Sequence, residues 1–327
     1  MERFRVVITD CDHGSIEEEK GELERIGAEL ILAQAQEESD LIRSCKEADG
    51  LINQYSILSR KVLESLPKCK VISRYGVGVD SVDLKAATEL GMIVANVPDY
   101  CMDEVADQTV AMILALIRKV VFFDQRVKAG VWDFREGIPI HRIRGRTLGL
   151  IGCGRIGLEV ARRVSGFGVK VIAFDPYLAK APAGIELKDF DSVLKESDMI
   201  SVHCPLNQAT RHLIGEPEFG KMEKKPIIIN TSRGPIVDEE ALTRALDQDL
   251  VSGAGLDVLE KEPPGSGHPL LSRSNVVLSP HISFYSVESI SELKRRTAKN
   301  VADVLAATWP GSVVNSDVRG KTRARFI

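Results

Sequence analysis

Short apolar runs alternate with polar, helix-like segments along most of the 327 residues. In the first hundred residues, the runs that predict strands are Arg5–Thr9, Glu29–Ala33, Gly50–Asn53, Val71–Arg74 and Ile93–Val97. Polar segments such as Ser15–Arg25 and Ser39–Lys46 lie between them and favour helices. Strands that alternate with helices predict a mostly parallel sheet with helices on both faces.

A long helix separates this series of strands from a second one. Apolar residues at helical spacing predict the helix from about Met102 to Phe122, and the less regular stretch Lys128–Gly145 follows it. The later predicted strands are Leu148–Ile151, Val169–Phe174, Met199–His203, Ile227–Asn230, Ser252–Asp257 and Val276–Leu278, before a last helix from about Ser286 to Ala307. The pattern predicts an α/β protein with two doubly wound parallel-sheet domains. Such sheets bind ligands near the carboxyl ends of their strands, so we expect a cleft between the domains.

Composition and charge argue against several classes of protein. A net charge of −4 argues against a nucleic-acid surface built on bulk positive charge, and the basic tail from Arg319 to Arg325 is expected to be solvated. The six cysteines show no C-x-x-C spacing, which favours isolated reduced thiols over a disulfide framework or a metal site. We see no secretory leader before the run Phe4–Thr9 and no apolar stretch of membrane-spanning length. We therefore expect a soluble, cytoplasmic protein.

A glycine fingerprint opens the second series of strands. The residues Gly152, Gly154 and Gly157 have G-x-G-x-x-G spacing between a predicted strand and a predicted helix, which is the context that a dinucleotide site requires. Asp175 follows at the end of the next strand, where a carboxylate accepts hydrogen bonds from the adenine ribose and repels a 2′-phosphate. NAD is therefore expected rather than NADP. The alternative for Asp175 is a turn residue before Pro176.

The fingerprint assigns roles to the two predicted domains. Residues 101–299 are expected to form the NAD-binding domain, and residues 1–100 with 300–327 are expected to form the substrate domain.

Three further residues follow the fingerprint in an informative order. Arg233 offers a planar fork for a carboxylate, Glu262 an orienting carboxylate, and His281 an acid or base that works near neutral pH. Together they are what the reduction of a 2-oxo acid requires. Taken singly, each could be an ordinary surface or loop residue.

These motifs resemble those of a known family, the D-isomer-specific 2-hydroxyacid dehydrogenases, which include phosphoglycerate dehydrogenases and C-terminal-binding proteins. The resemblance covers essentially the whole chain. It rests on the segments Gly152–Gly157 with Asp175, His203–Leu206, Asn230–Asp238, Gly255–Pro264 and Ser279–His281. It implies a Rossmann NAD domain inserted into a flavodoxin-like substrate domain.

The resemblance also implies roles for individual residues. His281 resembles the general acid that protonates the carbonyl oxygen, Glu262 the carboxylate that orients it, and Arg233 the residue that holds the substrate carboxylate. The implied cofactor contacts, besides the glycines and Asp175, are Arg155, Ile156, Pro205, Thr231 and Asp257. The implied substrate contacts, besides Arg233, are Tyr75, Gly76, Val77 and Phe284, the last replacing a tryptophan of C-terminal-binding proteins.

Several alternatives remain open at the level of sequence. The expected activity is NAD-dependent interconversion of a 2-oxo acid and a D-2-hydroxy acid. The alternative is an NAD(H)-responsive scaffold or corepressor-like binding protein, and a third possibility is hydride abstraction from formate or phosphite. A homodimer is expected by resemblance, with the helix from Met102 and the stretch Lys128–Gly145 at the interface. The pattern does not rank the possible 2-oxo acids.

Overall fold

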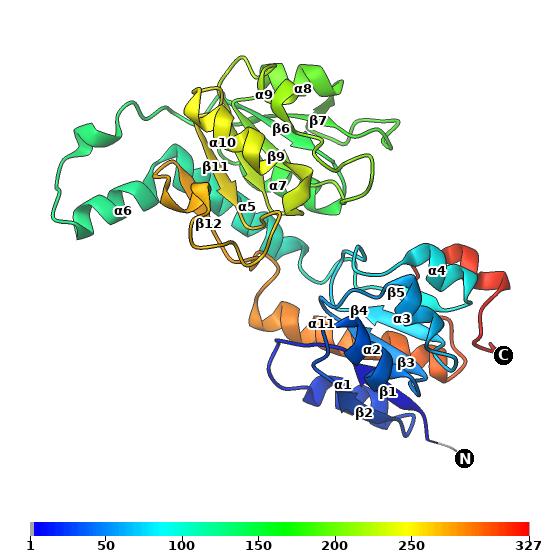
Figure 1. The fold of residues 1–327 in the computed structure, drawn as a ribbon. Coiled ribbons are helices and arrows are strands. Elements are labelled where there is room, and N and C mark those ends of the chain that lie inside the picture. The colour runs from blue at the N-terminus through cyan, green and yellow to red at the C-terminus, as the bar shows by residue number, and fades with distance from the viewer. Residues whose placement is uncertain (1–2, 327) are drawn as a thin grey trace. The chain divides into compact units, whose positions relative to one another are not determined.

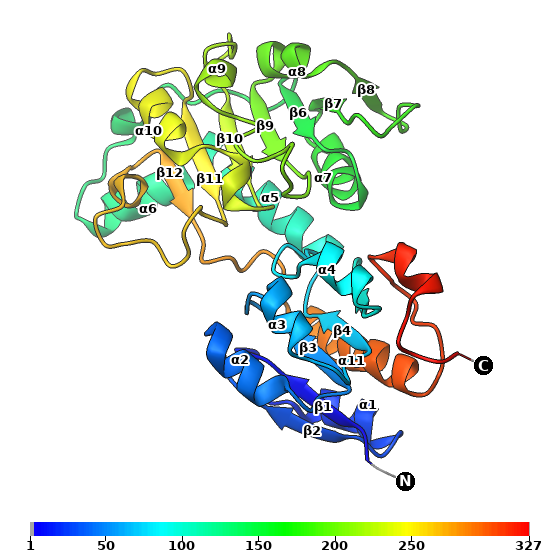
Figure 2. The same cartoon turned by 45° about the vertical axis from the view of Figure 1, so that its right-hand side comes forward.

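The computed structural model describes residues 3–326, and the chain divides into two compact units. Unit 1 contains the residues up to Tyr100 together with those from Ser286 onward, and unit 2 contains Cys101–Tyr285. Each unit is built on one parallel sheet, as Figures 1 and 2 show. The predicted class of two doubly wound parallel sheets is confirmed.

Unit 1 has a five-stranded sheet in the order β2-β1-β3-β4-β5, which is the flavodoxin-like order. Its strands are β1 (Arg5–Ile8), β2 (Glu29–Leu32), β3 (Gly50–Asn53), β4 (Val71–Arg74) and β5 (Ile93–Ala95). Its helices are α1 (Glu17–Glu24), α2 (Glu38–Cys45), α3 (Arg60–Glu64), α4 (Leu84–Glu89) and α11 (Val287–Leu305), with a 3₁₀ turn at Ser316–Gly320. Side chains of α2, α3 and α4 share one apolar core with the sheet, and α11 packs on β3, β4 and α1.

Unit 2 has a seven-stranded sheet in the order β12-β11-β10-β9-β6-β7-β8, the Rossmann order with one added strand. Its strands are β6 (Thr147–Ile151), β7 (Lys170–Phe174), β8 (Ile185–Leu187), β9 (Met199–Val202), β10 (Ile227–Asn230), β11 (Gly253–Leu256) and β12 (Val276–Leu278). Its helices are α5 (Met102–Ile117), α6 (Val120–Lys128), α7 (Arg155–Ser165), α8 (Phe190–Glu196), α9 (Glu216–Phe219) and α10 (Glu239–Asp247), with 3₁₀ turns at Phe134–Gly137, Gly234–Ile236 and Pro269–Ser272. Separate apolar cores lie on the two faces of this sheet, one with α5 and α7 and the other with α8, α9 and α10. Strands buried on both faces explain why their sequences read as continuous apolar runs.

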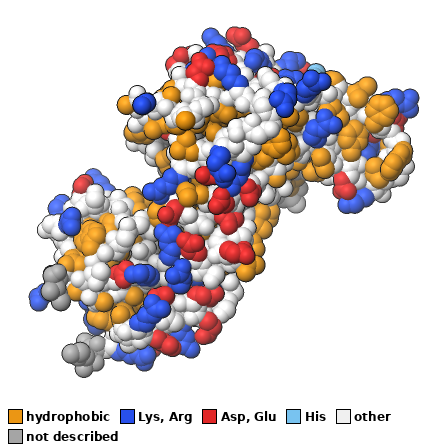
Figure 3. Space-filling view, turned by 180° about the vertical axis from the view of Figure 1, so that it is seen from behind, with side chains coloured by type: hydrophobic (Ala, Val, Ile, Leu, Met, Phe, Trp, Pro, Cys, Tyr) orange, Lys and Arg blue, Asp and Glu red, His pale blue; other side chains and the backbone are white. Residues whose placement is uncertain are grey.

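The predicted helix from Met102 to Phe122 is two helices. Lys119 has a left-handed backbone, with φ of 53°, which ends α5 at its C-terminus and lets α6 start in a new direction. Residues 120–145, called the arm below, extend away from the unit 2 sheet (Figure 1). No residue of α6 is buried, and hydrophobic side chains gather on the arm, at the right of Figure 3.

Three other expectations need correction. The short edge strand β8 was not predicted, because its three residues carry no clear apolar run. The predicted boundary at residue 300 falls inside α11, and the whole helix belongs to unit 1, because it is continuous from its Ser286 cap and packs on that sheet. The basic tail is not simply solvated, since the Arg323 guanidinium donates to the carbonyls of Leu66 and Cys69.

Between residues 3 and 326, no helix combines the length and the apolar character that crossing a bilayer requires.

Candidate active site

The glycine fingerprint forms a tight turn between β6 and α7. Gly152 has φ of 91°, and a Cβ there would lie 2.8 Å from the carbonyl carbon of His203, at the end of β9. A Cβ on Gly157 would lie 2.7 Å from the carbonyl oxygen of Gly152, so this glycine lets α7 pack closely on the turn. Both close approaches require glycine.

Gly154 differs from the other two glycines because no protein atom lies within 4 Å of the position that its Cβ would take. The space in front of it is open, at the exposed N-terminus of the 11-residue helix α7. The first amides of a helix have no partner within the helix and carry partial positive charge, which suits a pyrophosphate. The turn therefore fits the diphosphate of a dinucleotide, with Arg155 and Ile156 in the first turn of α7 beside it.

Asp175 lies directly after β7, and its carboxylate accepts two backbone hydrogen bonds. Oδ2 accepts from the amide of Cys153 at 2.9 Å, and Oδ1 accepts from the amide of Tyr177 at 3.0 Å. The first bond ties the carboxylate to the glycine turn, and the second is that of a turn residue. The two readings of Asp175 are thus compatible, because a carboxylate has about four acceptor positions.

The other predicted cofactor residues lie at the carboxyl ends of neighbouring strands of unit 2. Pro205 follows β9 and is exposed, whereas Thr231 follows β10 and is buried. The hydroxyl of Thr231 lies 2.9 Å from the hydroxyl of Thr109 on α5. These positions follow from the parallel sheet, since the carboxyl ends of its strands share one edge.

Arg233 lies in the segment that follows β10. Its backbone carbonyl accepts from the side-chain amide, Nδ2, of Asn230 at 2.9 Å. Its guanidinium donates to the backbone carbonyl of Ser232 at 2.7 Å. The next residue, Gly234, packs directly on the Leu259–Glu260 peptide, where any Cβ would overlap backbone atoms. Glycine at 234 therefore brings the Arg233 segment against the loop that carries Glu262.

Glu262 and His281 form the centre of the site. The Oε2 atom of Glu262 lies 2.7 Å from Nδ1 of His281, and Oε1 accepts from the amide of Leu259 at 2.9 Å. Partial burial disfavours the charged carboxylate, but the hydrogen bond and charge of His281, the Leu259 amide and the charge of Arg233 outweigh it. The net effect lowers the pKa of Glu262. All three predicted catalytic residues thus lie at one end of unit 2.

Asp257, predicted to line the cofactor site, holds the histidine segment in place. Its buried carboxylate accepts from the amides of Ile282 and Ser283, each at 2.9 Å, and from the hydroxyl of Ser279. Its carbonyl accepts from the amide of His281 at 2.7 Å. His281 has a left-handed backbone, with φ of 51°, which is uncommon outside glycine. These bonds maintain that conformation, a role that the sequence does not reveal.

His203 was predicted only as part of a motif, and the structure gives it a distinct environment. Its Nε2 lies 2.8 Å from the hydroxyl of Ser201, and burial lowers the pKa of His203 from 6.5 to about 4. The ring is therefore neutral near pH 7.

The predicted substrate residues fall in both units. Phe284 lies in unit 2, its ring edge-on to His281 with centroids 6.2 Å apart. In unit 1, Gly76 has φ of 131° and Val77 is exposed. Tyr75 is buried, its amide donates to the carbonyl of Asn53, and its hydroxyl donates to Glu19. In the loop after β4, Gly76 and Val77 are thus the residues available for contact with a substrate. The amide and the hydroxyl of Tyr75 already form hydrogen bonds within unit 1.

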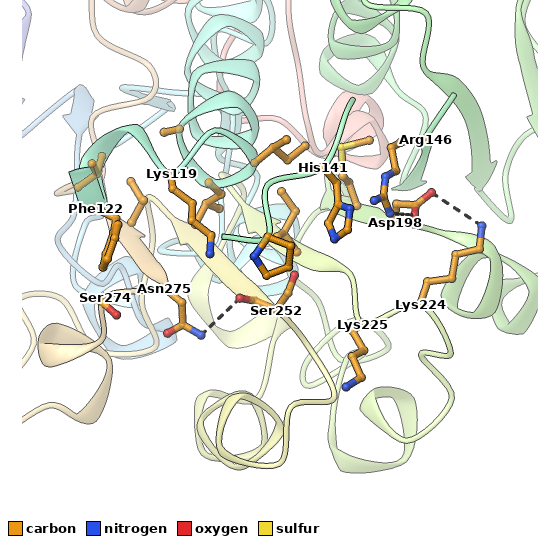
Figure 4. A pocket seen from close by; sticks show the side chains of 18 of the residues that line it. Lys119, Phe122, His141, Arg146, Asp198, Lys224, Lys225, Ser252, Ser274 and Asn275 are labelled. Atoms are coloured by element: carbon orange, nitrogen blue, oxygen red, sulfur yellow. Dashed lines mark hydrogen bonds and ion pairs between the residues drawn. The ribbon is translucent and has the colours of Figure 1, made fainter. Parts of the chain in front are cut away.

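A cavity of about 590 Å³ lies elsewhere in unit 2 (Figure 4). Its lining includes Arg146, Asp198 and Ser252, which come directly before β6, β9 and β11, and the α5–α6 junction around Lys119. It therefore lies at the amino edge of the sheet, opposite the edge that carries His281. We do not assign the reaction to this cavity.

Comparisons with known proteins agree with the site. A family model described as "D-isomer specific 2-hydroxyacid dehydrogenase, NAD binding domain" matches residues 110–283. A glyoxylate reductase from Thermofilum pendens is 38% identical over 290 residues, which cover 85% of each chain. A D-lactate dehydrogenase from Aquifex aeolicus, solved with NAD and lactic acid, has 29% identity and a TM-score of 0.85, covering 95% of this chain and 99% of that one. An NADPH-dependent glyoxylate/hydroxypyruvate reductase from Sinorhizobium meliloti, solved with NADP and malonate, has 28% identity and a TM-score of 0.87, covering 100% of both chains. The chain belongs to the D-isomer specific 2-hydroxyacid dehydrogenase family and is an NAD(P)-dependent enzyme.

Proposed function

We propose that this enzyme interconverts a small 2-oxo acid and the corresponding D-2-hydroxy acid with NAD as its cofactor. The observation that carries the proposal is the 2.7 Å contact between Glu262 and His281, next to the segment of Arg233. An imidazole oriented by a carboxylate is a suitable proton donor to a carbonyl oxygen, and a guanidinium is a suitable partner for a carboxylate.

The roles of the side chains follow from their atoms. Nδ1 of His281 faces Glu262, so Nε2 is the nitrogen that exchanges a proton with the substrate oxygen. Glu262 stays ionised because its pKa is lowered, and its charge stabilises the imidazolium that must form before the proton is given up. Arg233 binds the substrate carboxylate and polarises the neighbouring carbonyl. NADH, when bound, supplies a hydride to the carbonyl carbon.

The remaining contacts of the proposal divide between cofactor and substrate. The glycine turn with Arg155 and Ile156 would hold the pyrophosphate, and Asp175 the adenine ribose. Pro205, Thr231 and Asp257 would lie at the nicotinamide half. Gly76, Val77 and Phe284 would contact the substrate. The relatives are named for glyoxylate, hydroxypyruvate and lactate, which supports a 2-oxo acid with few carbon atoms.

The decisive experiment follows NADH oxidation at 340 nm with 2-oxo acids from glyoxylate to phenylpyruvate. We expect turnover with small acids and a loss of about 10²–10⁴ in kcat for His281→Asn, with NADH binding retained. Glu240→Gln, at a 91% exposed side chain of the same unit and outside the arm, is the control and should keep full activity. Unchanged turnover in His281→Asn would refute the mechanism. NADH binding without turnover on any acid would favour the scaffold alternative.

We also propose that the protein is a homodimer whose interface is formed by the arm. Trp132, Phe134 and Ile138 on the arm are 89%, 73% and 57% exposed. Exposed aromatic side chains in one segment indicate a surface that another protein covers. Part of the lining of the cavity beside the arm is apolar, at Leu116, Ile117 and Phe122, and part is charged, at Arg146, Asp198 and Lys224, so the arm adjoins a hollow of mixed polarity. In a two-fold dimer, the same region serves both protomers.

A further inference from the structure

Two glutamates in unit 2 bind each other's backbone amides. The Glu239 amide donates to Oε1 of Glu260 at 3.1 Å, and the Glu260 amide donates to Oε1 of Glu239. Glu239 is the first residue of α10, and Glu260 belongs to the loop after β11. We call this reciprocal pair the glutamate clasp. It joins the first turn of α10 to that loop.

Each carboxylate of the clasp also faces a histidine. Nε2 of His268 lies 2.9 Å from Oε2 of Glu239, and Nε2 of His212 lies 3.2 Å from Oε2 of Glu260. His212 also lies 3.7 Å from the carboxylate of Asp238, the N-cap residue of α10. The side chain of Glu239 is only 13% exposed. An imidazole N–H can donate to the carboxylate that it faces, so each histidine can occupy one acceptor position of its glutamate.

The clasp lies next to the residues of the proposed mechanism. Glu260 is two residues before Glu262. The amide of Leu259, the residue directly before Glu260, donates to Oε1 of Glu262. Gly234, which follows Arg233, packs on the Leu259–Glu260 peptide. A displacement of this peptide would therefore move the Glu262 carboxylate and change its contact with His281.

We propose that Glu239 and Glu260 are positioning residues, which hold the Leu259–Glu262 segment so that the Glu262 carboxylate reaches Nδ1 of His281. The inference rests on the proposed function. Displacement of a catalytic group by about 1 Å can cost up to 10²-fold in rate, so the clasp needs no contact with substrate to affect turnover.

The test compares Glu260→Ala, which removes the acceptor for the Glu239 amide, with Glu260→Gln, which keeps an acceptor oxygen. We expect kcat for 2-oxo acid reduction to fall about tenfold in Glu260→Ala and much less in Glu260→Gln, with the Kd for NADH unchanged within about twofold. Glu240→Ala is the control. It also removes one carboxylate, from the residue that follows Glu239 in α10, whose side chain is 91% exposed. The His281 imidazole, titrated by NMR in the cofactor-free protein, should shift its pKa in Glu260→Ala and not in Glu240→Ala.

A double-variant cycle separates this inference from the proposed function. If Glu260 acts through Glu262, adding Glu260→Ala to Glu262→Gln should lower kcat no further. Full additivity, or an unchanged His281 titration in Glu260→Ala, would overturn the clasp proposal. An unaffected kcat in Glu262→Gln and His281→Asn would instead overturn the proposed function.

Discussion

At the scale of the residue, we propose two tasks for the carboxylate of Asp175. It accepts from the amides of Cys153 and Tyr177, which fixes the turn, and it has acceptor positions left for the hydroxyls of a ribose. Its negative charge would repel the 2′-phosphate of NADP. Relatives solved with NAD and with NADP are both known, so the proposed preference of this chain for NAD rests on this one charge.

We expect Asp175→Asn to raise the ratio of kcat/KM with NADPH to that with NADH by about tenfold, a change of about 1.4 kcal/mol. Asparagine keeps an oxygen that can accept an amide, so the turn is less disturbed than in Asp175→Ala. Steady-state kinetics with both cofactors measures the ratio. An unchanged ratio in both variants would show that Asp175 is only a turn residue.

The half-buried imidazole of His203, whose pKa burial lowers, should make stability depend on pH. Its pKa is about 4 in the folded protein and 6.5 as the ordinary value, so between these pH values the unfolded chain binds a proton that the folded protein does not. Acidification from pH 6.5 to about 4 therefore favours unfolding, by about 1.4 kcal/mol per pH unit at most, and by less where water reaches the ring.

Urea unfolding at several pH values tests this expectation. The wild type should lose up to about 3 kcal/mol more than His203→Gln between pH 6.5 and 4. The carboxylates that both proteins share cancel in this difference. Equal slopes for wild type and His203→Gln would show that His203 is protonated in the folded protein.

At the scale of the element, the site depends on how loops follow parallel strands. The segments after β10, β11 and β12 carry Arg233, Glu262 and His281, and neighbouring strands bring these segments together. The packing between the first two segments is backbone on backbone, at Gly234.

We expect Gly234→Ala to lower both stability and turnover. Its methyl group would overlap the carbonyl of Leu259 and the amide nitrogen of Glu260, and overpacking of this kind costs about 1–3 kcal/mol. Displacement of the Leu259–Glu262 segment should also reduce kcat. Thermal unfolding and kinetics are compared with Gly267→Ala, where no atom lies within 4 Å of the added carbon. Wild-type behaviour of Gly234→Ala would mean that the loop adjusts freely.

At the scale of the whole molecule, the arm decides the expected assembly. We expect light scattering to give about twice the chain mass of 35.9 kDa. Replacing both Trp132 and Phe134 by serine should give monomers, because it removes the aromatic side chains of the proposed interface. Both side chains are mostly exposed in the single chain, so their loss should cost little folding energy. Tyr177→Ser, at an 88% exposed aromatic residue of the same unit, is the control. A dimer that survives the double substitution would place the interface elsewhere.

The sequence by itself determined the fold class, and it supplied the residues that we propose for the site. Strands buried on both faces produce apolar runs that can be found one by one, and alternation with helices then leaves little choice but parallel sheets. The glycine fingerprint is local, so its spacing already implies the turn that Gly152 and Gly157 form. Short or irregular features were not predicted from the sequence. The strand β8 has only three residues, and the break at Lys119 is one backbone angle, so neither produces a periodic pattern.

Only the tertiary structure decided how the site residues are arranged. That Nδ1 of His281 faces Glu262, that Asp257 holds the histidine segment, and that Glu239 binds the Glu260 amide all depend on contacts between segments about 20 residues apart. The burial that lowers the pKa of His203 likewise depends on the surroundings of the folded ring. The pattern of apolar and polar residues in the sequence indicates which face of a helix or strand is apolar. The direction of a polar side chain at the end of a strand is set by the neighbours that packing brings to it.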